Sequence, residues 1–210
     1  MGLIYKKKIT EDCVIGFWEI TENLDEVMSR IKLSDEETEA MKNFSNERRR
    51  LQWLCTRALL AEISDSEKKI IYNNNGKPYL LDASNNISIS HSDDLVSIIL
   101  SKNHLVGLDI EKITGKVEKI EARFLSSEER LAVDEKNRIN QLYTYWCAKE
   151  ALYKIFGEKE IAFEGNIKID PFVYDESGSF TGRVLTSRRS EEYELSYCII
   201  YDYMVVWIIK

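Results

Sequence analysis

The chain contains a weak internal repeat, which restricts its fold more strongly than any other feature of the sequence. Three segments of the first half recur in the same order in the second half: LSDEE (33–37) as LSSEE (125–129), QWLCTRALL (52–60) as YWCAKEALY (145–153), and LVSIIL (95–100) as MVVWII (204–209). This alignment pairs Trp53 with Trp146 and, at a polar position, Arg57 with Glu150. The sequence therefore predicts two similar structural units in one chain.

The repeat predicts an α+β fold made of two similar halves, residues 1–103 and 104–210, related by a pseudo-twofold axis. Each half should pack long helices on a small antiparallel sheet. With 210 residues, of which 44% are hydrophobic, each half can bury a core of its own. Ligands commonly bind where two such units meet, so we expect an active cleft between the halves. Because one chain would supply both walls of this cleft, a monomer is expected.

Hydrophobic periodicity and turn signals predict the positions of the helices and strands. Ser34, with Glu37 at the spacing of a capping box, begins one helix, and a longer helix follows over 48–63. An Asn-Gly turn at 75–76 joins two short strands, and the main helix of the second half covers 141–156. Further strands are predicted at 2–8, at 14–19, over 87–100 on either side of a polar corner at 91–94, and at 104–113, 162–169, 183–186, 194–201 and 204–210.

The composition argues against several classes of protein. No apolar run approaches the roughly 20 residues of a membrane helix, and the N-terminal segment lacks the features of a signal peptide, so a cytoplasmic location is expected. A net charge of −7 argues against general nucleic-acid binding. The four cysteines form no CxxC pair, which favours reduced, packed thiols over disulfides or a zinc site: Cys13, Cys55, Cys147 and Cys198.

The helix predicted at 141–156 carries polar side chains along the edge of its apolar face. The apolar stripe consists of Ala148, Ala151, Leu152 and Ile155. Trp146, Glu150 and Lys154 form a second row at i, i+4 and i+8, with Lys149 beside it, and such an edge can hold a ligand. For this helix alone, the simpler interpretation is an ion pair between Glu150 and Lys154, which stabilises a helix by about 0.2–0.5 kcal/mol.

Two carboxylates share one face of the strand predicted over 106–111. Because side chains alternate along a strand, Asp109 and Glu111 point to one side, and the apolar residues point to the other. Two unit charges about 4 Å apart repel by about 4 kcal/mol at an effective dielectric constant of 20. The pair therefore favours a cation, and its oxygen ligands suit Mg²⁺. The alternative is a solvated strand end in which Lys112 neutralises the charge.

Several other side chains are candidates for binding phosphate groups. Lys77 follows a turn glycine and precedes Pro78, which fixes the local backbone. His91, beside Ser90, is predicted at the corner between two strands, and Arg48–Arg50 stand at the start of the first long helix. A solvated lysine, a turn histidine and a charged helix face would explain the same residues. His91 is not accompanied by a G-x-S-x-G motif or by a second histidine at ligand spacing, so hydrolase triads and zinc sites gain no support.

In their order along the chain, five short motifs resemble the signature of the 4′-phosphopantetheinyl transferases, and in particular the monomeric surfactin-synthetase-activating type. The motifs are GKP (76–78), ISHS (89–92), GLDIE (107–111), RFLSSEE (123–129) and WCAKEALYK (146–154). The resemblance covers about residues 33–169 and agrees with the duplicated α+β architecture of that type.

The resemblance implies transfer of the phosphopantetheine arm of coenzyme A to a serine of an acyl or peptidyl carrier protein, with release of adenosine 3′,5′-bisphosphate. The carrier proteins of fatty acid, polyketide or nonribosomal peptide synthesis are the implied partners. The implied cofactor is Mg²⁺, with coenzyme A as co-substrate. No nucleic acid or membrane partner is expected.

The resemblance also implies roles for individual residues near the metal. Asp109, Glu111 and Glu150 would bind the Mg²⁺ that bridges to the coenzyme A pyrophosphate. Glu150 would help to remove the proton of the attacking serine. Lys154 would complete the catalytic set with Asp109 and Glu150, either by neutralising pyrophosphate oxygens or by sharing the proton transfer. Trp146 is expected to pack between helix and strand and to support the site.

At the nucleotide end, the resemblance implies that Ser90 and His91 hold phosphates and that Lys77 holds the 3′-phosphate of coenzyme A. Some relatives carry nucleotide-binding lysines before the first long helix, where this chain has the acidic residues 35–37. We therefore expect Arg49 or Arg50 to make that contact.

Two other functions would use the same residues. A metal-dependent phosphohydrolase would activate water with the three carboxylates, although the sequence lacks the extra Asp and His ligands usual in two-metal hydrolases. A carrier-binding or nucleotide-binding module without turnover would be expected only if Asp109 or Glu150 were missing.

Overall fold

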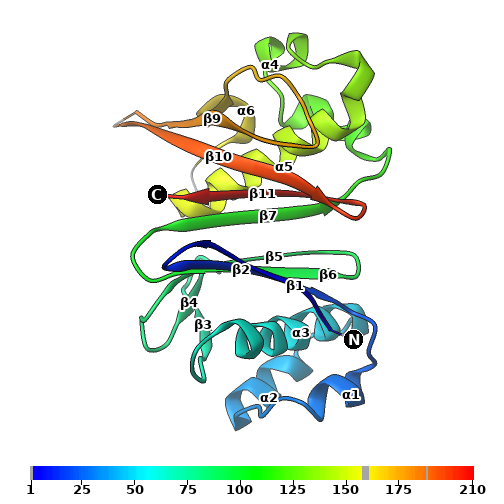
Figure 1. Ribbon diagram of the computed structural model, residues 1–210, viewed down its shortest axis with the longest axis vertical. Coiled ribbons are helices and arrows are strands. Elements are labelled where there is room, and N and C mark those ends of the chain that lie inside the picture. The colour runs from blue at the N-terminus through cyan, green and yellow to red at the C-terminus, as the bar shows by residue number, and fades with distance from the viewer. Residues whose placement is uncertain (1, 158–160, 188) are drawn as a thin grey trace. The chain divides into compact units, whose positions relative to one another are not determined.

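The computed structural model describes residues 2–157, 161–187 and 189–210, and contacts within the chain divide it into two compact units (Figure 1). The first comprises Met1–Tyr72 and Pro78–Asn103, and the second comprises Asn73–Lys77 and His104–Lys210. The predicted halves assign the turn at 73–77 to the first half, whereas the contacts assign it to the second unit. Both units combine helices with antiparallel sheet, which confirms the predicted α+β class.

The first unit is built on a four-stranded antiparallel sheet with the strand order β1-β2-β6-β5. Its elements are β1 (Leu3–Thr10), β2 (Cys13–Glu19), α1 (Leu24–Met28), α2 (Asp35–Lys42), α3 (Glu47–Ile63), β3 (Ile70–Tyr72), β4 (Pro78–Leu80), β5 (Asn86–Ser92) and β6 (Leu95–Ser101). Buried side chains of α3, including Leu54, Leu59 and Ile63, pack on this sheet. Gly16 allows the close approach, since a Cβ atom there would lie 2.7 Å from Ile63 Cγ2.

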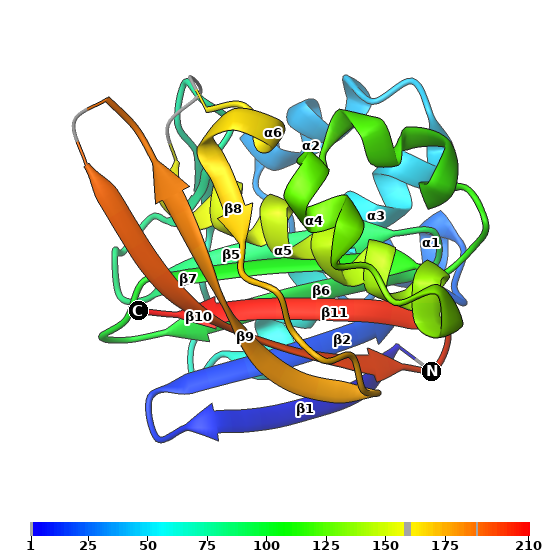
Figure 2. The ribbon, with the colours of Figure 1, turned by 90° about the horizontal axis from the view of Figure 1, so that it is seen from above.

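The second unit is built on a five-stranded antiparallel sheet with the order β7-β11-β10-β9-β8. Its strands are β7 (Val106–Lys112), β8 (Ile167–Ile169), β9 (Ser177–Leu185), β10 (Ser190–Ile200) and β11 (Tyr203–Ile209). Its helices are η1 (Val117–Arg123), α4 (Ser127–Leu131), η2 (Glu135–Asn137), α5 (Arg138–Phe156) and α6 (Phe163–Asn166). Helix α5 runs along one face of this sheet (Figure 2), and its buried residues form the core together with Met204, Val206 and Ile208 of β11.

Most helices and strands lie where the sequence predicts them. The capping box predicted at Ser34 is present at the start of α2. Helix α5 begins at Arg138, three residues before the predicted start, and its C-cap is Gly157, whose φ of 76° lies in the left-handed region that favours glycine. The polar corner predicted at 91–94 is narrower in the structure, because His91 and Ser92 still pair with β6.

The predicted strand over 162–169 is wrong in its first part, where residues 163–166 form α6. The Asn166 side chain accepts a hydrogen bond of 2.8 Å from the Ala162 backbone N–H and so closes a turn. The carbonyl oxygens of Phe163 and Ile167 both accept from Lys149 Nζ, which fixes this turn on α5. The apolar pattern of the segment contains no signal for either contact.

None of the helices in the described residues has both the length and the apolar character that crossing a membrane requires. All four cysteines are free thiols, of which Cys13, Cys55 and Cys147 are buried and Cys198 is half-buried. The predicted packing is therefore confirmed for Cys13, Cys55 and Cys147.

Candidate active site

Helix α5 approaches strand β7 closely because the strand carries a glycine at the contact. A Cβ atom at Gly107 would lie 2.5 Å from the Ala151 carbonyl oxygen and 3.1 Å from Ile155 Cβ. The face of β7 that includes Gly107 is therefore the face that packs on α5. By strand alternation, Asp109 and Glu111 lie on this same face.

Asp109 is buried and bound to the ammonium group of Lys154. Lys154 Nζ donates to Asp109 Oδ1 at 2.8 Å and to the Leu108 carbonyl oxygen at 2.9 Å. The Cys147 thiol also hydrogen-bonds to Asp109. Burial, together with the charge of Asp109, holds the pKa of this thiol well above its usual value, so the thiol stays protonated. The fold thus brings together two residues of the predicted catalytic set.

Glu111 is held by the indole of Trp146. Trp146 Nε1 donates to Glu111 Oε1 at 3.3 Å. The indole packs with its ring centroid 5.3 Å from that of Phe124 and 5.6 Å from that of Phe163. Trp146 therefore packs between helix and strand, as predicted, and also orients one of the carboxylates.

Glu150 occupies the same edge of α5, one turn after Trp146 and one turn before Lys154, and is half-buried. Burial and the negative charge of Asp109 raise its pKa to about 7, with a smaller contribution from Glu111, while the charge of Lys154 opposes the shift. A carboxyl group with such a pKa can take up and release a proton at neutral pH, which suits a general base.

The three carboxylates of Asp109, Glu111 and Glu150 suit a hard divalent cation such as Mg²⁺, which prefers oxygen ligands. After burial, the charges of Asp109 and, to a smaller extent, Glu111 contribute to the raised pKa of Glu150. In the part of the chain that the structure describes, no three His, Cys, Asp or Glu side chains are arranged to hold a metal ion as they stand. Instead, Asp109 Oδ1 contacts Lys154. The residues therefore suit such a cation in chemistry and charge, although they are not arranged as a ligand set in the structure.

Four of the predicted nucleotide-binding residues lie in the first unit on α3 and β5: Arg49, Arg50, Ser90 and His91. Arg49 Nη1 lies 3.2 Å from His91 Nε2. Both residues line a cavity of about 270 Å³, whose other lining residues are Asn46, Arg48 and Gln52. Ser90, the neighbour of His91 on β5, is buried. The cavity carries two guanidinium groups and an imidazole, a combination that suits an anion.

Arg50 and Lys77 have other contacts. Arg50 Nε donates to the Phe44 carbonyl oxygen at 2.7 Å, which ties the start of α3 to the preceding loop. Lys77 Nζ donates to the Ile155 carbonyl oxygen at 3.2 Å, in the last turn of α5, and burial lowers its pKa. A lysine at this position also interacts favourably with the C-terminal end of the helix dipole.

Lys149, predicted to lie beside the polar row, is a structural residue of the core. Its side chain is fully buried, and Nζ donates to Glu129 Oε2 at 2.7 Å. The same ammonium donates to the carbonyl oxygens of Ile167 at 2.9 Å and Phe163 at 3.1 Å. The capping-box spacing of Ser126 and Glu129 is visible in the sequence, but the buried partner of Glu129 is not.

Comparisons with known proteins find similarity in the segment that contains α5 and β7. Residues 105–199 match the family model of the 4′-phosphopantetheinyl transferase superfamily. The 4′-phosphopantetheinyl transferase gsp of Aneurinibacillus migulanus is 30% identical over 110 residues, which cover 50% of this chain and 46% of that protein. The 4′-phosphopantetheinyl transferase AcpT of Escherichia coli is 33% identical over 112 residues, which cover 50% of this chain and 57% of that protein.

The chain thus spans about half the length of the curated relatives it matches. The matched segment contains β7, α5 and the three carboxylates. The resemblance found in the short motifs is confirmed for this segment: residues 105–199 match the model of the 4′-phosphopantetheinyl transferase superfamily.

Proposed function

We propose that this protein transfers the 4′-phosphopantetheine arm of coenzyme A to a serine of a carrier protein and releases adenosine 3′,5′-bisphosphate. The observation that supports this most directly is the edge between α5 and β7, where Glu150 and Lys154 lie with Asp109 and Glu111 inside the segment that matches the family. This edge combines a carboxylate poised to take a proton with an ammonium group and two further carboxylates.

In the proposed reaction the serine Oγ of the carrier attacks the phosphorus that bears the pantetheine arm. An O–P bond to the serine forms, and the bond from that phosphorus to the bridging pyrophosphate oxygen breaks, with adenosine 3′,5′-bisphosphate as the leaving group. Glu150 takes the serine proton, either directly or through a water molecule. Its pKa of about 7 makes this carboxylate a better base than an ordinary glutamate at neutral pH.

Asp109, Glu111 and Glu150 would hold Mg²⁺, which when bound neutralises charge on the pyrophosphate. Trp146 keeps Glu111 in position through its indole N–H. Lys154 supplies the positive charge at this edge and would contact pyrophosphate oxygens once it leaves Asp109.

For the nucleotide end of coenzyme A, we propose Arg49, His91 and Ser90 as phosphate-binding residues, and Lys77 as the residue for the 3′-phosphate. The contact between Arg49 and His91 supports Arg49 over Arg50 for this role, because Arg50 is engaged by the Phe44 carbonyl oxygen. We also propose that the enzyme is a cytoplasmic monomer of the surfactin-synthetase-activating type, with the two units related by duplication.

The test is a transfer assay followed by mass spectrometry. Incubation with coenzyme A, Mg²⁺ and an apo carrier protein should add the mass of one phosphopantetheine arm to the carrier, and chelation of Mg²⁺ should prevent the addition. The absence of any mass gain across carriers of fatty acid, polyketide and peptide synthesis would refute the proposal. Release of nucleotide from coenzyme A without a carrier would instead indicate a phosphohydrolase.

A further inference from the structure

The ammonium group of Lys154 contacts the carboxylate of Asp109, one of the residues proposed to bind the metal. Nζ is 2.8 Å from Asp109 Oδ1 and 2.9 Å from the Leu108 carbonyl oxygen. The Asp109 side chain is only 6% exposed, whereas that of Lys154 is 28% exposed. The charged head of Lys154 is therefore directed from the edge of α5 into a mostly buried carboxylate.

This contact balances the charge of Asp109. Asp109, Glu111 and Glu150 carry up to three negative charges at one edge, and Lys154 is the cation bound to one of them. Burying an unpaired carboxylate is costly, so Asp109 needs a positive partner as long as the protein holds no cation.

We propose that Lys154 acts as a stand-in cation at Asp109, and that a divalent metal ion must displace its ammonium group from Asp109 before it can bind. The inference rests on the proposed function, since it takes Asp109 as a ligand of the metal. A Mg²⁺ ion binds carboxylate oxygens at about 2.0–2.1 Å, so an ion at Asp109 would lie close to the ammonium group on Oδ1, and the two positive charges would repel each other.

When a metal ion displaces it from Asp109, the Lys154 ammonium group moves to a second position. Once released from Asp109, the ammonium needs another anion, and the pyrophosphate of coenzyme A would supply one in the proposed complex. Lys154 should thus weaken metal binding to the free protein, and this effect should be smaller when coenzyme A is present. Metal entry and substrate binding are linked through one side chain.

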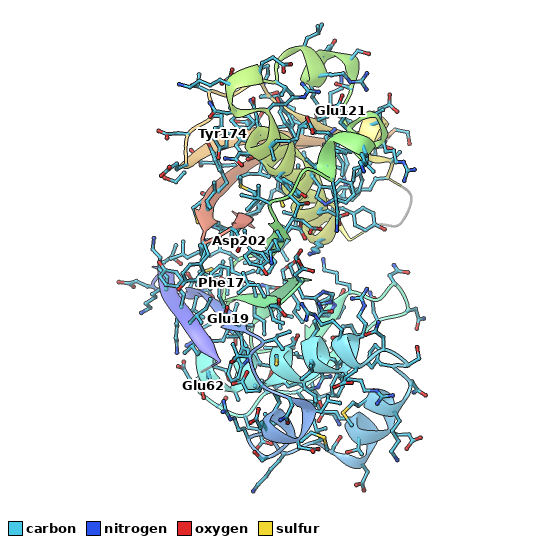
Figure 3. All side chains as sticks on the ribbon, turned by 90° about the vertical axis from the view of Figure 1, so that its right-hand side faces the viewer. Phe17, Glu19, Glu62, Glu121, Tyr174 and Asp202 are labelled. Atoms are coloured by element: carbon cyan, nitrogen blue, oxygen red, sulfur yellow. The ribbon has the colours of Figure 1, made fainter. Side chains whose placement is uncertain are left out.

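The test measures Mn²⁺ binding without coenzyme A, by electron paramagnetic resonance of the free ion, for the unchanged protein and for Lys154→Met. Removal of the competing charge should lower the Kd at least about tenfold. Lys112→Met is the matched control, because it removes one positive charge from β7 next to Glu111. Lys112 Nζ lies 3.6 Å from Oδ2 of Asp202, in the turn between β10 and β11 (Figure 3). The Lys112→Met variant should therefore bind Mn²⁺ with a Kd within about threefold of that of the unchanged protein.

Three results would overturn the proposal: equal or weaker binding by Lys154→Met, an equal gain in Lys112→Met, or no Mn²⁺ binding by any of the proteins. None of them bears on the transfer assay, in which coenzyme A supplies oxygen ligands of its own, so failure of this inference is distinguishable from failure of the proposed function.

A second measurement covers the case in which Lys154→Met folds poorly. The ¹⁵N signal of the Lys154 ammonium, assigned by its loss in Lys154→Gln, should move when Mg²⁺ is added to the unchanged protein. A signal that keeps its position at saturating Mg²⁺ would also overturn the proposal.

Discussion

The indole N–H of Trp146 donates to Glu111 Oε1 at 3.3 Å, so an aromatic side chain of the core holds one of the carboxylates proposed to bind the metal. The ring itself is fixed by Phe124 and Phe163, which belong to the loop before α4 and to α6. Packing in the second unit therefore determines the orientation of a site residue.

Trp146→Phe should keep the aromatic packing and remove the hydrogen bond to Glu111. Hydrogen bonds to charged groups contribute about 1.5–3 kcal/mol, and this one is long, so we expect the Mg²⁺ concentration for half-maximal transfer to rise about three- to tenfold. The melting temperature should change little. The measurement is a Mg²⁺ titration of the transfer rate at saturating coenzyme A.

Trp53→Phe, at the position that the repeat equates with Trp146, is the matched control. Trp53 packs against Phe44 and under the Arg57 guanidinium in the first unit. This substitution should leave the Mg²⁺ dependence unchanged. A similar rise in both variants would mean that the effect of Trp146 is not carried by its bond to Glu111.

Gly107→Ala tests whether the distance between α5 and β7 is set by this glycine. The added methyl group would meet the Ala151 carbonyl oxygen at 2.5 Å, and a backbone atom cannot move aside as a flexible side chain can. We expect a loss of about 1–3 kcal/mol in the free energy of unfolding, measured with urea. Gly115→Ala is the control, because nothing lies within 4 Å of a Cβ atom there. Equal stability of the two variants would contradict the prediction.

Arg49→Ala and Arg50→Ala should separate nucleotide binding from folding. Arg49 lines the cavity beside His91, so its loss should raise the KM for coenzyme A about tenfold or more with a small change in kcat. Arg50 binds the Phe44 carbonyl oxygen, so its loss should lower the melting temperature while the KM stays within about twofold. Steady-state kinetics and melting curves on both variants check this, and the reverse pattern would assign the nucleotide contact to Arg50.

The sequence could predict the helix and strand that form the candidate site, because both follow simple periodicities. The stripe of α5 is buried, and its polar row contacts β7 through Trp146 and Lys154. The alternation along β7 correctly placed Asp109 and Glu111 on one face, since both side chains contact residues of α5. Periodicity identifies which side chains lie on the same face of a helix or strand. Here the polar row of α5 contacts the face of β7 that carries Asp109 and Glu111.

Contacts between distant parts of the chain could not be predicted in the same way. A lysine at position 149 looks like a surface residue, and only the fold supplies Glu129 and two carbonyl oxygens around its ammonium. The same contacts turn residues 163–166 into α6 instead of a strand. Buried polar groups are satisfied by tertiary partners, which local sequence patterns do not identify.

The repeat has a local counterpart in the two capping boxes. Ser34 and Glu37 cap α2, and Ser126 and Glu129 cap α4. In each unit the capping glutamate also binds a cation of the long helix, Arg57 of α3 in one case and Lys149 of α5 in the other. This common arrangement explains why the LSDEE and LSSEE segments are similar, and it gives Arg57 a structural partner.

Glu150→Gln preserves the shape of the side chain but removes a negative charge and a base. We expect transfer to fall by at least about 10²-fold, the lower bound for loss of a positioned acid–base group. Folding should be little affected or slightly improved, because burial and the charge of Asp109 already disfavour the ionised form of Glu150. Turnover is compared at saturating Mg²⁺ and coenzyme A, with melting temperatures measured alongside.

Arg57→Gln, at the position that the repeat equates with Glu150, should have the opposite effect. Arg57 Nε binds Glu37 Oε1 at 2.9 Å, and its guanidinium carbon lies 3.1 Å from the centroid of the Trp53 ring. Since both contacts are within the first unit and both side chains of the ion pair are largely buried, the loss should cost about 1–3 kcal/mol of stability. Transfer by the folded fraction should persist. Near-normal turnover by folded Glu150→Gln would show that α5 does not carry the catalytic base. A raised KM for coenzyme A in Arg57→Gln would show that Arg57 contacts the nucleotide.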